Sequence, residues 1–552
     1  MTLSVATPIA TPEHFPVDWD PPEMEGLFWW WDQMHHPHPV TPITFSLDGP
    51  AFSEGIGRVA RAFHMPFKKY HVARFNTYLY YGNEPNPLNA EQLAELNKQM
   101  EAEMAQRAPR VLQDWENIYL PEVQALNTRL REFAYDEAAD RDLADFLEEV
   151  AAIRARQWEL HMLAVLPAMG SAFMFADTYE SIFGAANNEH YGMLQGFPNK
   201  SVEAGQALYD LAQDIKDQPE VAAVIRETPV ERVFPELDRS PTGAAVAQRL
   251  RAYLDEYGWR SDQFELIDPS WREDPAPLFV NLRAYLEDTA IDPRAEQAKA
   301  VLERERLVAE MFERAPDQAG RNQLQMWVTV AQQYLPVQEN HNFYIDQMNT
   351  VLLRLPVLEC GKRLVRTGAV NKVDDAFFLT LEELQEAVPG AHADGRLLVA
   401  ERRAERERWW SIVPPSTLGT KPPDDGTGNP SLERFFGVGR EPSRQPRVIT
   451  GYGASKGVVT GTAKVVRSLA EADKLEPGDV LVCEMTMPPW TPLFSTVSAV
   501  VADSGGVLSH CAIVAREYRI PCVVGTVNGT QRIKDGQRLT VDGAQGIVRI
   551  ES

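Results

Sequence analysis

The sequence has little of several features that mark common classes of protein. It has only four cysteines in 552 residues; their spacing matches no metal site, and they fit a reducing cytoplasm. Basic residues are in deficit, and the net charge of −25 at pH 7 argues against nucleic acid or an anionic membrane as a partner. No run of eighteen apolar residues and no leader-like N-terminus occurs. We therefore expect a cytoplasmic protein with no membrane segment.

Most of the chain has the pattern of helices. Between about 21 and 410, apolar residues recur on one helical face, for example at Leu93, Leu96, Met100 and Met104. Aromatic and histidine-rich stretches interrupt this pattern, and the strand-like residues 78–81 suggest a small sheet. A chain of this length is sufficient for two to four domains with full cores.

The composition changes near residue 411. Residues 411–447 are rich in proline, glycine, serine and aspartate, without periodicity, which predicts a flexible linker. From 448 to 552, short strands follow one another closely, with one helix after His510. The predicted fold class is thus multidomain: a mostly α-helical region (1–410), a linker (411–447) and a compact β/α domain (448–552).

The clearest chemistry lies in the C-terminal region, between Asp503 and Thr526. His510 follows a Gly505–Gly506 turn and precedes an apolar helical run, so it stands at a predicted helix N-terminus. Paired glycines allow close approach of the backbone to a ligand, and a helix N-terminus favours negative charge. A histidine in this place directs a nitrogen nucleophile toward a position suited to a phosphoryl group.

This segment resembles the phosphohistidine loop of the swivelling domain shared by PEP synthases, pyruvate phosphate dikinases, PTS enzyme I and rifampin phosphotransferases. The resemblance implies that His510 becomes phosphorylated. It also implies that several residues of the loop and of the preceding Thr-x-Pro-x-Trp segment support the phosphohistidine. The supporting residues are Gly505, Gly506, Ser509, Arg516 and Thr486. For the Thr-x-Pro-x-Trp segment, a simple Pro-rich turn is an equal alternative. The same resemblance predicts a first hairpin within 451–466, a strand over 497–503 and a closing hairpin.

Two stretches of the helical region are similar to the substrate-binding region of rifampin phosphotransferases and phenylphosphate synthase-type proteins. Residues 257–275 keep the Arg260 and Glu265 of that pattern, while Trp259 replaces its histidine. Residues 370–384 match a second segment. The resemblance implies that the helical region binds the acceptor of the phosphoryl group.

The phosphoryl donor has no recognisable site in the sequence. The helical region has neither a glycine-rich phosphate loop nor alternating strands, and we expect no PEP-binding barrel after the swivelling domain. We therefore expect a separate ATP-grasp partner that binds ATP with Mg²⁺, and neither a metal nor a firmly bound cofactor in this chain. Such a split arrangement is similar to synthases that phosphorylate phenol or 4-cresol.

Transfer to a phenol calls for a base or a hydrogen-bond acceptor, and histidine suits that task near neutral pH. His341 lies in a segment with Glu339 and several aromatic residues, although a helix histidine bonded to a neighbouring carbonyl is an equal alternative. A cationic residue could steady the phosphoryl group, or could simply be solvated surface charge. The candidate acceptor-site residues are His341, Glu339, Arg260, Glu265, His36, His71 and Arg74.

The resulting hypothesis is a phosphotransferase component that passes a phosphoryl group from ATP, through His510, to a small aromatic hydroxyl compound. One alternative is a component of a rifampin-type antibiotic phosphotransferase. Another is a non-enzymatic phosphocarrier or regulatory protein.

Overall fold

The computed structural model forms two compact units, neither of which is continuous in sequence. It describes residues 7–184, 189–286, 292–390, 394–422, 443 and 445–551. The first unit comprises Met1–Pro167, Gln263–Asp268 and Tyr344–Asn429, and the second comprises Ala168–Asp262, Pro269–Phe343 and Pro430–Ser552. The C-terminal domain therefore belongs to the same unit as part of the helical region.

Helices predominate in the first unit, as predicted. Its helix α2 begins with a capping box in which Asn89 and Gln92 satisfy each other's backbone N–H groups. The helices of this unit are α1 (Pro42–Ala62), α2 (Ala90–Arg107), α3 (Val111–Asp114), α4 (Leu120–Arg131), α14 (Met348–Thr367), α15 (Leu381–Ala387) and α16 (Arg396–Trp410), together with the first part of α5 (Asp140–Phe183).

The first unit also contains a five-stranded sheet with the order β1-β5-β2-β4-β3. Its strands are β1 (Thr7–Pro8), β2 (Phe28–Trp31), β3 (Phe67–Phe75), β4 (Tyr78–Pro85) and β5 (Thr417–Lys421). The small sheet suggested by residues 78–81 is present and larger than expected. Aromatic side chains from β2 and β4 fill its core, with Trp29 and Tyr80 fully buried.

Strand β5 corrects the predicted extent of the linker. It lies within 411–447 but pairs with β1 and β2, and Leu418 is buried in the sheet core. Backbone pairing supplied from a distant part of the chain overrides the polar, proline-rich composition. Residues 423–442 and 444 of the predicted linker lie outside the described residues.

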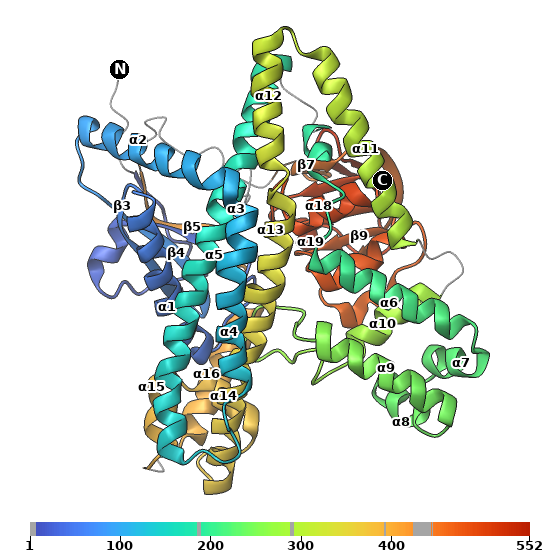
Figure 1. Ribbon diagram of the computed structural model, residues 1–552. Coiled ribbons are helices and arrows are strands. Elements are labelled where there is room, and N and C mark those ends of the chain that lie inside the picture. The colour runs from blue at the N-terminus through green and yellow to red at the C-terminus, as the bar shows by residue number, and fades with distance from the viewer. Residues whose placement is uncertain are drawn as a thin grey trace. The chain divides into compact units, whose positions relative to one another are not determined.

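The second unit combines helices with the C-terminal sheet. Its helices are α6 (Lys200–Lys216), α7 (Pro219–Glu227), α8 (Val233–Leu237), α9 (Pro241–Tyr257), α10 (Ala276–Leu286), α11 (Pro293–Arg314), α12 (Gln318–Ala331), α13 (Tyr334–His341), α18 (His510–Glu517) and α19 (Gly529–Arg532), together with the end of α5. In Figure 1 the red part is the C-terminal sheet with α18 and α19.

The C-terminal sheet has eight strands in the order β6-β13-β12-β8-β9-β10-β11-β7. They are β6 (Val448–Thr450), β7 (Tyr452–Ser455), β8 (Val458–Val465), β9 (Val480–Cys483), β10 (Ala499–Ala502), β11 (Cys522–Val524), β12 (Arg538–Asp542) and β13 (Ile547–Ile550). Strands β8 to β11 run parallel, and β10, buried along its whole length, leads into the His510 loop.

The structure confirms the closing hairpin and corrects the first one. Strands β12 and β13 pair antiparallel, as predicted. Strands β7 and β8 do not pair with each other: β7 pairs with β11, and β8 lies between β12 and β9. The two residues Lys456 and Gly457 between β7 and β8 therefore carry the chain from one edge of the sheet to its centre, an arrangement that local turn residues do not encode.

Within the residues that the structure describes, helix α5 alone is long and apolar enough to cross a membrane by length and composition. Its most apolar 18-residue window has a mean hydropathy of 1.4, and 61% of that window is buried inside the protein. A core helix of a folded domain has this same character.

Candidate active site

A strand, a turn and a helix place His510 at the surface of the C-terminal domain. After β10, the Asp503 carboxylate is buried and accepts hydrogen bonds from the Thr526 hydroxyl at 2.8 Å and from the Thr530 hydroxyl. These bonds fix the start of the loop to the segment that follows β11. Burial raises the pKa of Asp503 to about 6, against the effect of the threonine bonds.

The turn before His510 requires a glycine at its first position. Gly505 has φ +90°, and a Cβ atom there would lie 2.8 Å from Cβ of Ser509. Ser509 is the N-cap of α18, and its hydroxyl accepts a hydrogen bond from the Ala512 amide at 3.4 Å. His510 is thus the first residue of α18, where the free N–H groups of the helix favour an anionic group.

The imidazole of His510 lies between a hydroxyl and a carboxylate. Its Nε2 atom is 3.4 Å from Oγ1 of Thr491, and its Nδ1 atom is 3.4 Å from Oε2 of Glu339. The side chain of His510 is 12% exposed and that of Glu339 is 4% exposed. The structure therefore brings together two of the residues singled out from the sequence.

A second hydrogen bond, from α6, holds the Glu339 side chain in place. Its Oε2 atom also accepts a hydrogen bond from the Ser201 hydroxyl at 2.7 Å. Burial raises the pKa of Glu339, but attraction to His510 and the hydrogen bonds outweigh it, so the pKa lies below its usual value. The carboxylate is consequently ionised at neutral pH.

Further contacts hold α18 and the loop before it in place. The Tyr334 hydroxyl donates a hydrogen bond to the Leu508 carbonyl at 3.1 Å. Burial and then repulsion from Glu339 raise the pKa of Glu517 to about 8. Burial lowers the pKa of Arg516 to about 10, and this residue donates a hydrogen bond to the Ala454 carbonyl at 2.9 Å. Arg516 thus ties α18 to β7, and its role in the structure is to support the helix that begins at His510.

The Thr-x-Pro-x-Trp segment does lie against the loop, but through a different threonine. Thr491, in the 3₁₀ segment η9 (Pro488–Ser495), contacts His510. Thr486 is buried, and its hydroxyl has no hydrogen-bond partner among the described residues. Spacing within a Pro-rich turn does not reveal which hydroxyl faces the loop, and this explains why the sequence singled out Thr486 alone.

Two other candidates lie in the second unit, in buried positions. The Nδ1 atom of His341 lies 3.0 Å from the Val337 carbonyl, the helix contact that the sequence left open as its alternative. Arg260 donates a hydrogen bond from Nε to the Tyr257 carbonyl at 2.7 Å and lies over the ring of Phe343. Burial lowers the pKa of Arg260, and its Nη2 atom is unpaired within the described part of the chain.

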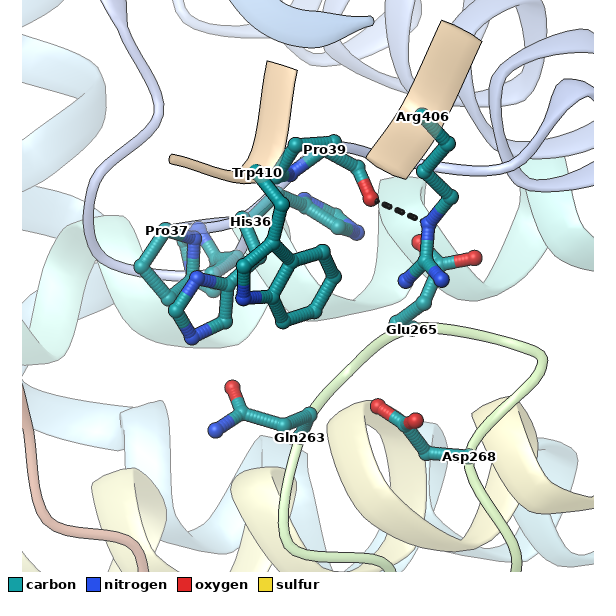
Figure 2. Close-up of a pocket in the computed structure, with 10 residues that line it drawn as sticks. His36, Pro37, Pro39, Gln263, Glu265, Asp268, Arg406 and Trp410 are labelled. Carbon is teal, nitrogen blue, oxygen red and sulfur yellow. Dashed lines mark hydrogen bonds between the residues drawn. The ribbon is translucent and has the colours of Figure 1, made fainter. Parts of the chain in front are cut away.

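In the first unit, His36 and Glu265 line a common pocket, although 228 residues separate them in the sequence. Figure 2 shows this pocket, with Glu265 and Asp268 coming from the 263–268 segment. Asp32 holds His36 at a distance of 3.0 Å. The sequence reasoning missed Asp32, whose spacing of three and four residues before His35 and His36 was a usable signal.

The remaining two candidates lie on β3 and do not line this pocket. His71 lies 3.3 Å from Glu84, and burial lowers its pKa. Arg74 lies 3.6 Å from Glu405, and burial lowers its pKa as well. Each of these two side chains thus lies beside a carboxylate of the first unit, as in an ordinary surface ion pair.

Comparisons with known protein families match two parts of the chain. Residues 160–339 match the family described as rifampicin phosphotransferase fourth domain, and residues 475–546 match the mobile domain of PEP-utilising enzymes. The second match covers strands β9 to β12 and the His510 loop. Glu339 is the last residue of the first match and His510 lies inside the second.

Three curated relatives extend the similarity over more of the chain. Chondramide synthase cmdD of Chondromyces crocatus is 34% identical over 98% of the chain, which spans 14% of that protein. The uncharacterized phosphotransferase YvkC of Bacillus subtilis is 28% identical over 93% of the chain and 60% of its own length. A rifampicin phosphotransferase of Streptomyces sviceus is 30% identical over 71% of the chain and 44% of its own length. The chain thus spans between 14 and 60% of these relatives.

Proposed function

We propose that this chain is a phosphotransferase component that carries a phosphoryl group on His510 and delivers it to a hydroxyl group of a small molecule. One observation carries the proposal: His510 stands at the N-terminus of α18 with an ionised carboxylate beside Nδ1 and a hydroxyl beside Nε2. The matches to the PEP-utilising mobile domain and to rifampicin phosphotransferases support it.

The carboxylate of Glu339 determines which imidazole nitrogen reacts. It favours a proton on Nδ1, and the lone pair is then on Nε2. In the loading step Nε2 forms a bond to phosphorus while the bond from phosphorus to the donor oxygen breaks. The N–H groups at the start of α18 and the hydroxyl of Thr491 are placed to stabilise the charge of the phosphoryl group.

In the delivery step the acceptor hydroxyl oxygen attacks phosphorus. The P–O bond forms as the P–N bond breaks, the electron pair returns to Nε2, and the hydroxyl proton leaves to a nearby base. Glu339 keeps Nδ1 protonated throughout, so the imidazole is a better leaving group than an unpaired one. Such a transfer depends mainly on positioning and charge stabilisation.

For the donor, the proposal includes a separate ATP-grasp protein that binds ATP with Mg²⁺. For the acceptor, it includes a small aromatic alcohol such as phenol or 4-cresol, supported by the resemblance to synthases of that type. A rifampicin-type acceptor is the second candidate, supported by the 71% of the chain that aligns with a rifampicin phosphotransferase.

The test is an intact-mass measurement of the full chain incubated with ATP, Mg²⁺ and an ATP-grasp protein. We expect a phosphoryl adduct on the wild type and on the control His14→Ala, whose side chain is exposed, but none on His510→Ala. Addition of phenol, 4-cresol or rifampicin to the loaded protein then identifies the acceptor by loss of the adduct and appearance of a phosphate ester. An adduct that survives in His510→Ala contradicts the proposal. A stable adduct that no acceptor discharges favours a phosphocarrier or regulatory protein.

A further inference from the structure

A second pocket of the first unit lies along helix α16 and is open to solvent. Its volume of about 310 Å³ is at the lower end of the range for small-ligand pockets, roughly 300–1,000 Å³. One lining residue comes from the 3₁₀ segment η7 (Val373–Phe378), and the others share one face of α16 because they are spaced by three and four residues. The lining residues are Phe378, Arg403, Arg406, Glu407 and Trp410.

Helix α16 is basic although the chain is acidic. Its 15 residues include five arginines and three glutamates, whereas the whole chain has a net charge of −25. A guanidinium group stays protonated in a folded protein, so this charge does not depend on pH. The pocket along α16 therefore favours an anionic ligand.

Stacking on aromatic rings holds the two guanidinium groups that line the pocket. The guanidinium carbon of Arg403 lies 4.2 Å from the ring centroid of Phe378. That of Arg406 lies 4.7 Å from the ring centroid of Trp410, on which His38 also stacks with centroids 4.6 Å apart. A guanidinium that stacks through its face keeps its N–H edges free for hydrogen bonds.

Among the described residues, each of these guanidinium groups bonds through one nitrogen atom. Nη2 of Arg403 donates a hydrogen bond to the Asp375 carboxylate at 2.9 Å. Nε of Arg406 donates one to the Pro39 carbonyl at 2.8 Å, as Figure 2 shows. Within the part of the chain that the structure describes, neither Nη atom of Arg406 has an acceptor and no carboxylate forms an ion pair with it. These N–H groups are available to a ligand.

Two neighbouring guanidinium groups match a phosphate group better than a carboxylate. A bidentate pair with one guanidinium uses both oxygens of a carboxylate. A phosphate monoester has three terminal oxygens and a charge of about −1.5 to −2 near pH 7, so it can bond Arg403 and Arg406 together. The aromatic rings of Phe378 and Trp410 supply apolar surface for the organic group of such an ester.

Glu407 gives the pocket a contribution of opposite sign. Its carboxylate lines the same pocket and is exposed, so its repulsion of an anion is screened by solvent. Two guanidinium groups and one carboxylate still leave a positive lining. Removal of the Glu407 charge should therefore strengthen the binding of an anion, whereas removal of the Arg406 charge should weaken it.

We infer that this pocket binds a small phosphate monoester, with the phosphate between Arg403 and Arg406 and the organic group against Trp410. Binding requires no phosphoryl transfer, so the inference does not depend on the proposed function.

The test is a ligand-observed NMR titration of the full chain with phenyl phosphate. Benzoate is the matched ligand, because it has the same ring with a carboxylate in place of the phosphate. We expect phenyl phosphate to bind with a Kd on the order of 1 mM or tighter, and about 10-fold more tightly than benzoate.

Variants then locate the ligand. Arg406→Gln should weaken the binding of phenyl phosphate about 10-fold, and Arg406→Lys, which keeps the charge but loses the planar fork, about 3-fold. Arg408→Gln is the matched control: it removes the same charge from an exposed position of α16 outside the pocket, and should bind as the wild type does.

Glu407→Gln changes only an exposed side chain and should tighten binding about 2- to 3-fold. This variant keeps the test decisive if loss of the bond between Arg406 and Pro39 disturbs folding, which the urea unfolding midpoint of each variant measures.

Equal affinities in Arg406→Gln and Arg408→Gln overturn the inference, as does benzoate that binds as tightly as phenyl phosphate, or weaker binding in Glu407→Gln. The variants of α16 should still accept a phosphoryl group on His510 in the intact-mass measurement. Failed binding beside normal phosphorylation contradicts this inference alone, and normal binding without phosphorylation contradicts the proposed function alone.

Discussion

Two histidines of this protein each lie beside a carboxylate, but the two pairs differ in distance, in number of further partners and in exposure. His36, in the first unit, lies 3.0 Å from Asp32, whose carboxylate also binds His35 and Tyr81. His510, in the second unit, lies 3.4 Å from Glu339 and is the more exposed of the two histidines. The His36 side chain is thus fixed by a network of close contacts, whereas the His510 imidazole has two longer ones, to Glu339 and Thr491, each at 3.4 Å. Three predictions can break or sharpen this contrast.

The largest effect is expected from Asp32→Asn. This change removes a buried charge whose partners, His35, His36 and Tyr81, remain in place, and should lower the stability of the first unit by about 3–5 kcal/mol. The pKa of Asp32 is depressed in the folded state, so its contribution is present above the usual carboxyl range and is lost as the pH falls through the folded pKa. The difference between variant and wild type in urea unfolding should thus shrink toward low pH.

The matched control for this prediction is Asp18→Asn. Asp18 is exposed, and its change should alter the stability by no more than about 0.5 kcal/mol. If Asp32→Asn is as mild as this control, the network around His36 is not rigid and the contrast with His510 fails.

A smaller effect is expected from Glu339→Gln, and it should appear in rate rather than in stability. Loss of the carboxylate removes the preference for a proton on Nδ1 of His510, so the delivery step should slow about 10- to 100-fold, or roughly 1.4–2.8 kcal/mol in the barrier. Single-turnover discharge of the phosphorylated chain measures this step. Ser201→Ala, which removes only one hydrogen bond to Glu339, should slow it less.

The pH profile separates positioning from simple structural damage. Because the pKa of Glu339 lies below its usual value, the wild-type rate should not fall with decreasing pH until the pH is below the ordinary carboxyl range. In Glu339→Gln this fall in rate at low pH should be absent. A variant with the wild-type profile and rate would show that the contact between Glu339 and His510 has no part in transfer.

The two histidines also differ in how far the sequence revealed them. The Gly505–Gly506 turn, His510 and its helix are contiguous, and a local pattern is sufficient to predict a strand, a turn and a helix there. The pocket around His36 depends on Glu265 and Arg406, which are brought in from 229 and 370 residues away. No local pattern contains such pairings, and the same holds for β5 in the predicted linker and for the separation of β7 from β8.

The smallest effect is expected from Asp268→Asn in the His36 pocket. Burial, and then repulsion from Glu265, raise the pKa of Asp268 to about 7, the opposite of the shift at Asp32. A group whose folded pKa lies above its unfolded value costs stability that is absent below about pH 4, grows as the pH rises, and becomes constant above about pH 7. After allowance for partial exposure, the variant should therefore gain on the order of 1–2 kcal/mol relative to wild type between pH 5 and pH 8. Urea unfolding at four pH values in this range measures the gain, with Asp18→Asn as the control that should show none. A gain that does not depend on pH would mean that Asp268 is ionised throughout, and that its pKa is not raised in the folded protein.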